Sequence, residues 1–71
     1  MKVIFIEIYY NNWNKIDNGV VYETSDIQIP VKGNIIYIND KTYEVKNVSY
    51  HFYTDELIEN YVKVELLESK F

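Results

Sequence analysis

The sequence predicts a small all-β domain, in which five strands form a single, partly open barrel over residues 1–71. Three observations lead to this prediction. With 71 residues, the chain is too short for two separate cores. It contains ten Ile, eight Tyr and three Phe but no Ala, and this composition favours strands over helices. Apolar and polar residues alternate in several short stretches, which turn-forming residues separate.

Glu7 sets the expected orientation of the first strand, residues 3–10. If this carboxylate points to water, alternate residues share its outer face and the others point to the core. The outer set is then Val3, Phe5 and Tyr9, and the inner set is Ile4, Ile6, Ile8 and Tyr10.

The second strand is expected over residues 20–24, after a long hairpin loop at residues 11–19. Asn18-Gly19 in this loop suits the positive φ of a tight turn. The same alternation predicts that Glu23 faces water and that two apolar residues face inward, Val20 and Tyr22.

The third and fourth strands follow a corner at residues 29–33. Pro30 cannot donate a backbone hydrogen bond to a neighbouring strand, so the corner is expected to start the third strand at residues 35–38. A tight turn at residues 39–41 then leads into a long fourth strand, residues 42–53.

A bulge is expected in this long strand near Lys46-Asn47, because the apolar pattern changes parity there. The pattern runs through Tyr43 and Val45 before this point, and after it through Val48, Tyr50 and Phe52. The bulge bends the strand and places three residues outward, Ser49, His51 and Tyr53.

Residues 54–60 are expected to form a loop or one short helical turn, with Thr54 as a possible N-cap. Residues 61–67 are the expected last strand. Five strands, one of them long and bent, favour a small SH3-like or OB-like barrel.

Seven Lys, no Arg and eleven acidic residues give the chain a net charge of −4. This charge repels phosphate backbones and anionic membranes, so nucleic-acid binding and membrane binding are not expected. The absence of Cys excludes disulfides, thiolate metal sites and Cys nucleophiles. Glu7 interrupts the apolar N-terminal run, and no stretch reaches the roughly 20 apolar residues of a membrane span, so we expect a cytoplasmic protein.

Catalysis is not expected either. His51 is the only side chain that could act as a base at neutral pH, and no nucleophile motif, P-loop or GxGxxG fingerprint is present. His51 lies close in sequence to Asp55, Glu56 and Glu59, which are possible metal ligands. A structural zinc site, however, needs four ligands and usually Cys or several His. We therefore interpret these residues as a solvated acidic connection beside a surface His, and expect no metal and no cofactor.

Residues 29–48 resemble the pattern of small SH3-like barrel proteins of bacteriophages and mobile elements. A corner with Pro30 and Gly33 precedes an apolar strand, a tight turn, a Tyr43-x-Val45 strand and a following Val48. Asp40 stands in the turn where the pattern usually has Gly. The resemblance covers less than a third of the chain and implies an accessory or counter-defence protein that acts in the host cytoplasm.

The chain is expected to expose more apolar surface than a small monomer leaves in water. The predicted strand orientations place a set of large side chains outward, namely Phe5, Tyr9, Ile35, Tyr37, Tyr53, Tyr61 and Leu67. Either a homo-oligomer covers them or they form a face that binds a partner, and both can hold together. Trp13, in an Asn-rich loop, either plugs an open end of the barrel or is an exposed anchor.

These features together predict a non-enzymatic accessory protein that inhibits host defence by binding. Two mechanisms fit: the protein blocks a host defence protein, or it sequesters a small nucleotide signal between subunits by aromatic stacking. The candidate binding residues are Tyr9, Asn11, Asn12, Trp13, Asn14, Tyr37, His51 and Tyr53. Two alternatives stay open: a structural or adaptor protein that assembles through its apolar faces, and an OB-like nucleic-acid-binding module, which the net charge disfavours.

Overall fold

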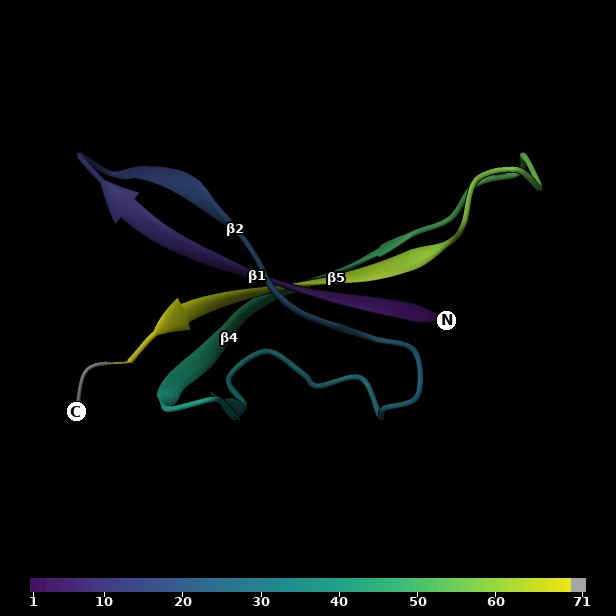
Figure 1. Cartoon of the computed structure of the whole chain (residues 1–71). Helices are drawn as coiled ribbons and strands as arrows, with labels where there is room; N and C mark the ends of the chain where they lie inside the picture. The colour runs from purple at the N-terminus through teal and green to yellow at the C-terminus, as the bar shows by residue number, and fades with distance from the viewer. Residues whose placement is uncertain (70–71) are drawn as a thin grey trace.

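The computed structural model describes residues 1–69, which form one five-stranded sheet (Figure 1). The strands are β1 (Lys2–Asn11), β2 (Asn14–Thr24), β3 (Ile35–Ile38), β4 (Lys41–His51) and β5 (Tyr61–Glu68). Their order across the sheet is β2-β1-β5-β4-β3. The sheet is mixed, because β1 and β5 run parallel while the other neighbours are antiparallel. The predicted all-β class and the five strands are confirmed.

The sheet does not close, so the predicted barrel is wrong in this respect. Its two edges are β2 and β3, and they do not pair with each other. β3 has only four residues, and the connection that precedes it crosses the open side, where Ile29 packs against the core. Figure 1 shows this connection looping away from the end of β2 below the crossing strands.

The predicted helical turn is also wrong, since the part of the chain that the structure describes contains no helix. Residues 54–60 form a loop that Asp55 holds in a turn. Its carboxylate accepts a hydrogen bond from the Leu57 backbone N–H at 2.9 Å, and its carbonyl accepts one from Ile58 at 3.1 Å. In an Asx-type turn the Asp carboxylate accepts a backbone N–H, as it also does at the start of a helix, but here no helix follows.

The main core cluster lies on one face of the three central strands. Val3 and Phe5 of β1 lie in register with Val62 and Val64 of the parallel strand β5, so their side chains point to the same face. The other buried members of this cluster are Leu66, Tyr43 and Val45. β5 therefore contributes most to the core, as the central strand of the sheet.

The predicted orientation of β1 is wrong, because Glu7 lies on the core face instead of pointing to water. Glu7 is in register with the core residue Leu66. Its Oε2 accepts a hydrogen bond from the Tyr43 hydroxyl at 2.9 Å, and its Oε1 accepts one from the Asn18 amide at 2.6 Å. Two donors satisfy the carboxylate at the end of the core. Val3 and Phe5, predicted to face outward, are buried on this face, whereas Ile8, predicted to point inward, is buried as expected but outside this core cluster.

The start of β2 differs from the prediction as well, because the hairpin turn is only two residues long. Asn12 and Trp13 form this turn, with φ of 51° and 68°. The Asn18-Gly19 pair instead lies inside β2, where Gly19 has φ of 100° and donates its N–H to the Asp17 carboxylate at 2.8 Å. A glycine with positive φ is as typical of a bulge as of a turn.

The register shifts between β1 and β2 also change part of the predicted pattern of the second strand. Val20, predicted to point inward, is exposed, and Val21 packs against the core instead. Tyr22 lies on the predicted core side, in register with Phe5 and with ring centroids 5.8 Å apart, although 49% of its surface is exposed. The predicted bulge in β4 is confirmed, since the β4–β5 register shifts between Val45 and Asn47. The turn between β3 and β4 is confirmed too, and Asn39 adopts its positive φ of 54°.

Candidate functional site

The candidate binding residues lie in three separate places. Five of them form the hairpin tip, which comprises Tyr9, Asn11, Asn12, Trp13 and Asn14. His51 and Tyr53 lie at the other end of the molecule, where β4 leads into β5 (Figure 1). Tyr37 lies on the edge strand β3. The molecule is 42 Å in its longest dimension, so the tip and the opposite end cannot contact one small ligand together.

Trp13 projects from the hairpin tip with 98% of its surface exposed, which excludes a barrel plug. Its φ of 68° lies in the left-handed region, where the second position of such a turn normally holds Gly. The left-handed conformation costs an L residue about 1–2 kcal/mol. The turn therefore holds the largest side chain of the chain in water at a backbone position that disfavours it.

The hairpin segment at residues 9–14 is rich in aromatic and amide side chains and carries no charge, although Lys15 follows it directly. Residues 9–14 contain two further exposed aromatic side chains, Tyr9 and Tyr10, and three Asn residues. Rigid aromatic rings beside adaptable amide groups are the chemistry of protein recognition surfaces.

At the opposite end of the molecule, three rings form a ring stack, which comprises His51, Tyr61 and Tyr53. The His51 and Tyr61 centroids lie 4.5 Å apart with planes at 5°, and Tyr61 and Tyr53 lie 6.4 Å apart at 25°. The loop is fixed there, because the Tyr53 backbone N–H donates to the Asn60 side-chain oxygen at 2.7 Å. The candidate binding residues included two of these rings, whereas Tyr61 was predicted only as one of the outward-facing side chains. Its register opposite His51 brings the two rings together.

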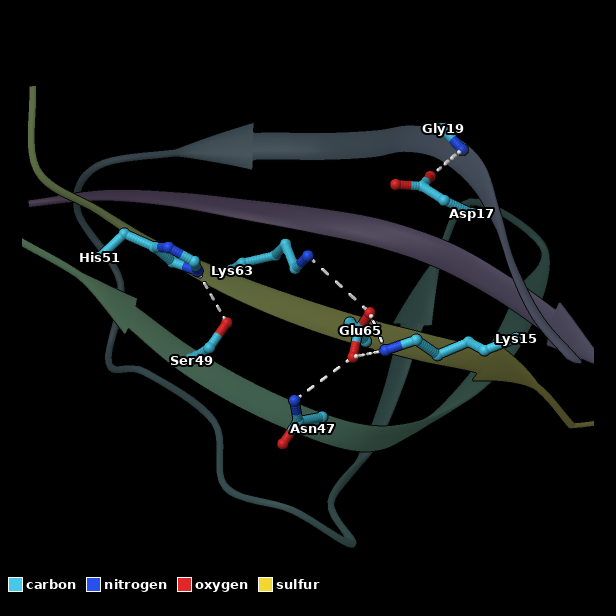
Figure 2. Close-up of polar contacts among 8 residues, drawn as sticks. All are labelled: Lys15, Asp17, Gly19, Asn47, Ser49, His51, Lys63 and Glu65. Atoms are coloured by element: carbon cyan, nitrogen blue, oxygen red, sulfur yellow. Dashed lines mark hydrogen bonds and ion pairs between the residues drawn. The ribbon is translucent and has the colours of Figure 1, made fainter.

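Ser49 and His51 form the one pair in residues 1–69 that is reminiscent of catalysis. The Ser49 Oγ and the His51 Nε2 are 2.9 Å apart, as Figure 2 shows. A hydrolytic triad also needs a carboxylate on the other imidazole nitrogen, and no such hydrogen bond is found in the described residues. The Ser49 hydroxyl thus contacts the same imidazole ring that stacks on Tyr61.

Glu65 is the one buried charged residue among residues 1–69, with 4% of its surface exposed. Its carboxylate accepts hydrogen bonds from the Lys15 ammonium at 3.0 Å and the Asn47 amide at 3.3 Å, and the Lys63 ammonium lies 3.9 Å away (Figure 2). Burial pushes the pKa of Glu65 up, but these hydrogen bonds and positive charges outweigh it and hold the pKa below its usual value. The cluster ties β2 and β4 to the central strand β5.

An apolar groove lies in the open gap between the edge strands, and we call it the seam. It has a volume of about 570 Å³ and is lined by Phe5, Tyr22, residues 27–31 and residues 34–38. Sequence reasoning missed this site because it expected a closed barrel, in which the gap would not exist. The available signal was the shortness of β3 after the Pro30 corner.

Comparison of the chain with known protein families, with curated proteins and with solved structures found no match. Within residues 1–69 no three His, Asp or Glu side chains lie close enough together to hold a metal ion. No helix able to cross a membrane exists in the same range.

Proposed function

We propose that the protein is a non-enzymatic binding protein that inhibits a host defence protein, with the hairpin tip as its principal contact. The observation that carries this proposal is Trp13, a Trp held almost entirely in water at a strained backbone position. Trp is among the residues that contribute most to binding energy when a partner buries them. Its neighbours supply the aromatic and amide groups that such surfaces use. The host defence target follows from the resemblance to phage accessory proteins.

The charge of the chain supports a basic partner. The net charge of −4 raises the encounter rate with a positively charged surface. The tip itself carries no charge, so the field of the whole protein steers the partner while Trp13 and its neighbours supply the contact. Association is therefore expected to slow as salt is added.

Trp13→Gly is expected to stabilise the protein by about 1 kcal/mol, because Gly adopts a positive φ without steric cost and the exposed indole makes no packing contribution. Asn12→Gly is the matched control, and its effect should be smaller because Asn tolerates the left-handed region. Urea unfolding followed by far-ultraviolet circular dichroism measures both. A destabilised Trp13→Gly variant would show that the indole packs in solution.

The binding role is tested with two nearly fully exposed apolar residues at opposite ends of the molecule, Trp13 and Leu57, which is 94% exposed. The tagged protein is used to capture partners from a bacterial host, and each captured protein is then purified and titrated. We expect Trp13→Ala to weaken binding at least tenfold, as an anchor residue should, and Leu57→Ala to leave it unchanged. A partner that binds both variants equally well would contradict the proposal.

The ring stack favours a second candidate, the stacking of a nucleotide base. Aromatic and imidazole rings in a row form platforms on which bases stack without sequence preference. Binding of a cyclic nucleotide should raise the midpoint of thermal unfolding by about 4 °C or more at saturation. Tyr53→Leu should abolish this shift, and Tyr50→Leu, a change at another exposed Tyr, should retain it. If no nucleotide shifts the midpoint, the nucleotide-stacking candidate is excluded and protein binding is the proposal that stands.

Self-association is a further way to cover the exposed apolar side chains, and we propose it alongside partner binding. Several exposed residues are large and apolar, including Val31, Tyr37, Phe52 and Leu57. Light scattering coupled to size exclusion should show a mass that rises with concentration above that of the 8.6 kDa chain. A constant monomer mass over the accessible concentration range would overturn this proposal.

A further inference from the structure

We propose that the seam binds an extended segment of another protein, which adds to the sheet as a strand along the free edge of β3. This inference concerns a surface distinct from the hairpin tip, and it does not depend on the role of Trp13. Strand addition to an exposed edge combines backbone hydrogen bonds with pockets for every second side chain.

The backbone groups of β3 point alternately toward β4 and away from it. The carbonyl of Asn34 accepts the Val45 N–H at 2.9 Å, so Asn34 presents its carbonyl to β4. Along an antiparallel strand, successive residues direct their backbone groups to opposite sides. Ile35 and Tyr37 therefore direct their N–H and C=O groups away from β4 and toward the seam. No strand of the described residues pairs with this edge of β3.

The two edges of the sheet differ in how well they are protected. β2 carries Lys15 and Asp17 and contains the bulge at Gly19, and charges and bulges are the features that block strand addition. β3 reads Ile-Ile-Tyr-Ile, with no charge, no Pro and no register shift against β4. β3 is thus the edge that is open to an added strand.

The seam provides the side-chain pocket that such a strand needs. Its volume of about 570 Å³ lies within the range of roughly 300–1,000 Å³ typical of ligand sites. In the described chain its lining contains no charged residue and is formed mainly by aromatic and aliphatic side chains. Every second side chain of the occupant should therefore be apolar.

The lining of the seam favours a free segment over the edge strand of a second copy, and the charge of the whole chain favours a basic segment. Tyr22 of β2 and the connection at residues 27–31 also line the seam, so they bound the space beside β3. Strands in a sheet lie about 4.8 Å apart, so a strand that belongs to a folded sheet would bring its own neighbour into this boundary. The net charge of −4 also attracts a positively charged segment. The occupant is therefore an extended segment with apolar residues at alternate positions and Lys or Arg between them.

The test uses a displayed library of random twelve-residue peptides selected on the purified full-length protein. We expect the enriched peptides to alternate apolar and polar residues, to prefer Lys and Arg over Asp and Glu, and to lack Pro in their centre. A synthetic enriched peptide should then slow the amide exchange of Ile35 and Tyr37. Ile36, whose backbone groups face β4, should change little.

Tyr37→Pro removes a backbone N–H that faces the seam, and Pro is tolerated at such edge positions. The loss of this hydrogen bond should weaken binding of the synthetic peptide about tenfold. Tyr37→Val also removes the ring but keeps the N–H, so it separates the side-chain effect from the loss of the hydrogen bond, and it should bind the peptide more tightly than Tyr37→Pro.

Three outcomes would overturn the proposal: no peptide is enriched, the peptide binds Tyr37→Pro as tightly as Tyr37→Val, or the protected amides lie on β2. If Tyr37→Pro does not fold, the exchange pattern of the unmodified protein decides by itself.

Discussion

Leu66→Ala is expected to destabilise the protein by about 3 kcal/mol, within the range of 2–5 kcal/mol found for such core truncations. Leu66 is fully buried on the central strand β5, in register with Glu7 of β1 and Val45 of β4. Truncation removes apolar burial and leaves a cavity. Because β5 is paired with a strand on each side, the backbone cannot shift enough to fill this cavity. A domain of this size has little stability in reserve, so a large fraction of the variant should be unfolded at 37 °C.

Leu57→Ala is the matched control, since it makes the same chemical change at a residue that is almost fully exposed. Its expected effect is within about 0.5 kcal/mol of zero. Urea unfolding followed by far-ultraviolet circular dichroism gives both values, and an unchanged m-value shows that the denatured state is not affected. Equal stabilities of the two variants would mean that β5 is not the centre of the core.

Acidification below the ordinary glutamate pKa of 4.5 is the second change with a large expected effect. The pKa of Glu65 is lower in the folded protein than in the unfolded chain, so the unfolded chain binds protons first as the pH falls. The stability from the ionised carboxylate is present above pH 4.5 and is lost as the pH falls through the folded pKa. Glu7 acts in the same direction, because hydrogen bonds from Asn18 and Tyr43 lower its pKa against the effect of burial.

Glu65→Gln should reduce this pH dependence and cost about 1.5–3 kcal/mol at neutral pH, the contribution typical of hydrogen bonds to a charged group. Lys15→Met should shift the acid transition to higher pH, because burial then raises the pKa of Glu65 with less opposition. Glu23→Gln, at an exposed carboxylate paired with Lys2, is the control and should change little. Thermal unfolding midpoints between pH 2 and 7 measure all three. An unshifted acid transition in Lys15→Met would contradict the role given to the Glu65 cluster.

The local alternation of apolar and polar residues was sufficient to predict the strands and the bulge in β4. It did not predict which face of β1 points to the core. The change of parity after Val45 has a local cause, so it can be read from the chain. The orientation of β1 depends on Tyr43 and Asn18, two distant donors that let Glu7 face the core. Closure of the sheet depends likewise on whether the edge strands β2 and β3 pair with each other, and no short segment of the sequence determines this.

The candidate site was predictable where it depended on residue type alone. An Asn-rich segment around Trp13 indicated a contact surface, and the structure exposes the whole segment. The turn itself was misplaced, because Asn18-Gly19 matches the usual hairpin preference and a Trp at positive φ does not. The seam was not predictable, since it arises from residues of β1, β2 and β3 that are brought together only by the fold.

Trp13 is the only indole of the chain, and it is already hydrated in the native state. The emission wavelength of Trp13 should consequently change little on denaturation, since the indole is exposed to water in both the folded and the unfolded chain. A shift of its emission toward shorter wavelengths would instead signal that another molecule has covered it. The protein thus carries a built-in optical reporter of complex formation that needs no label.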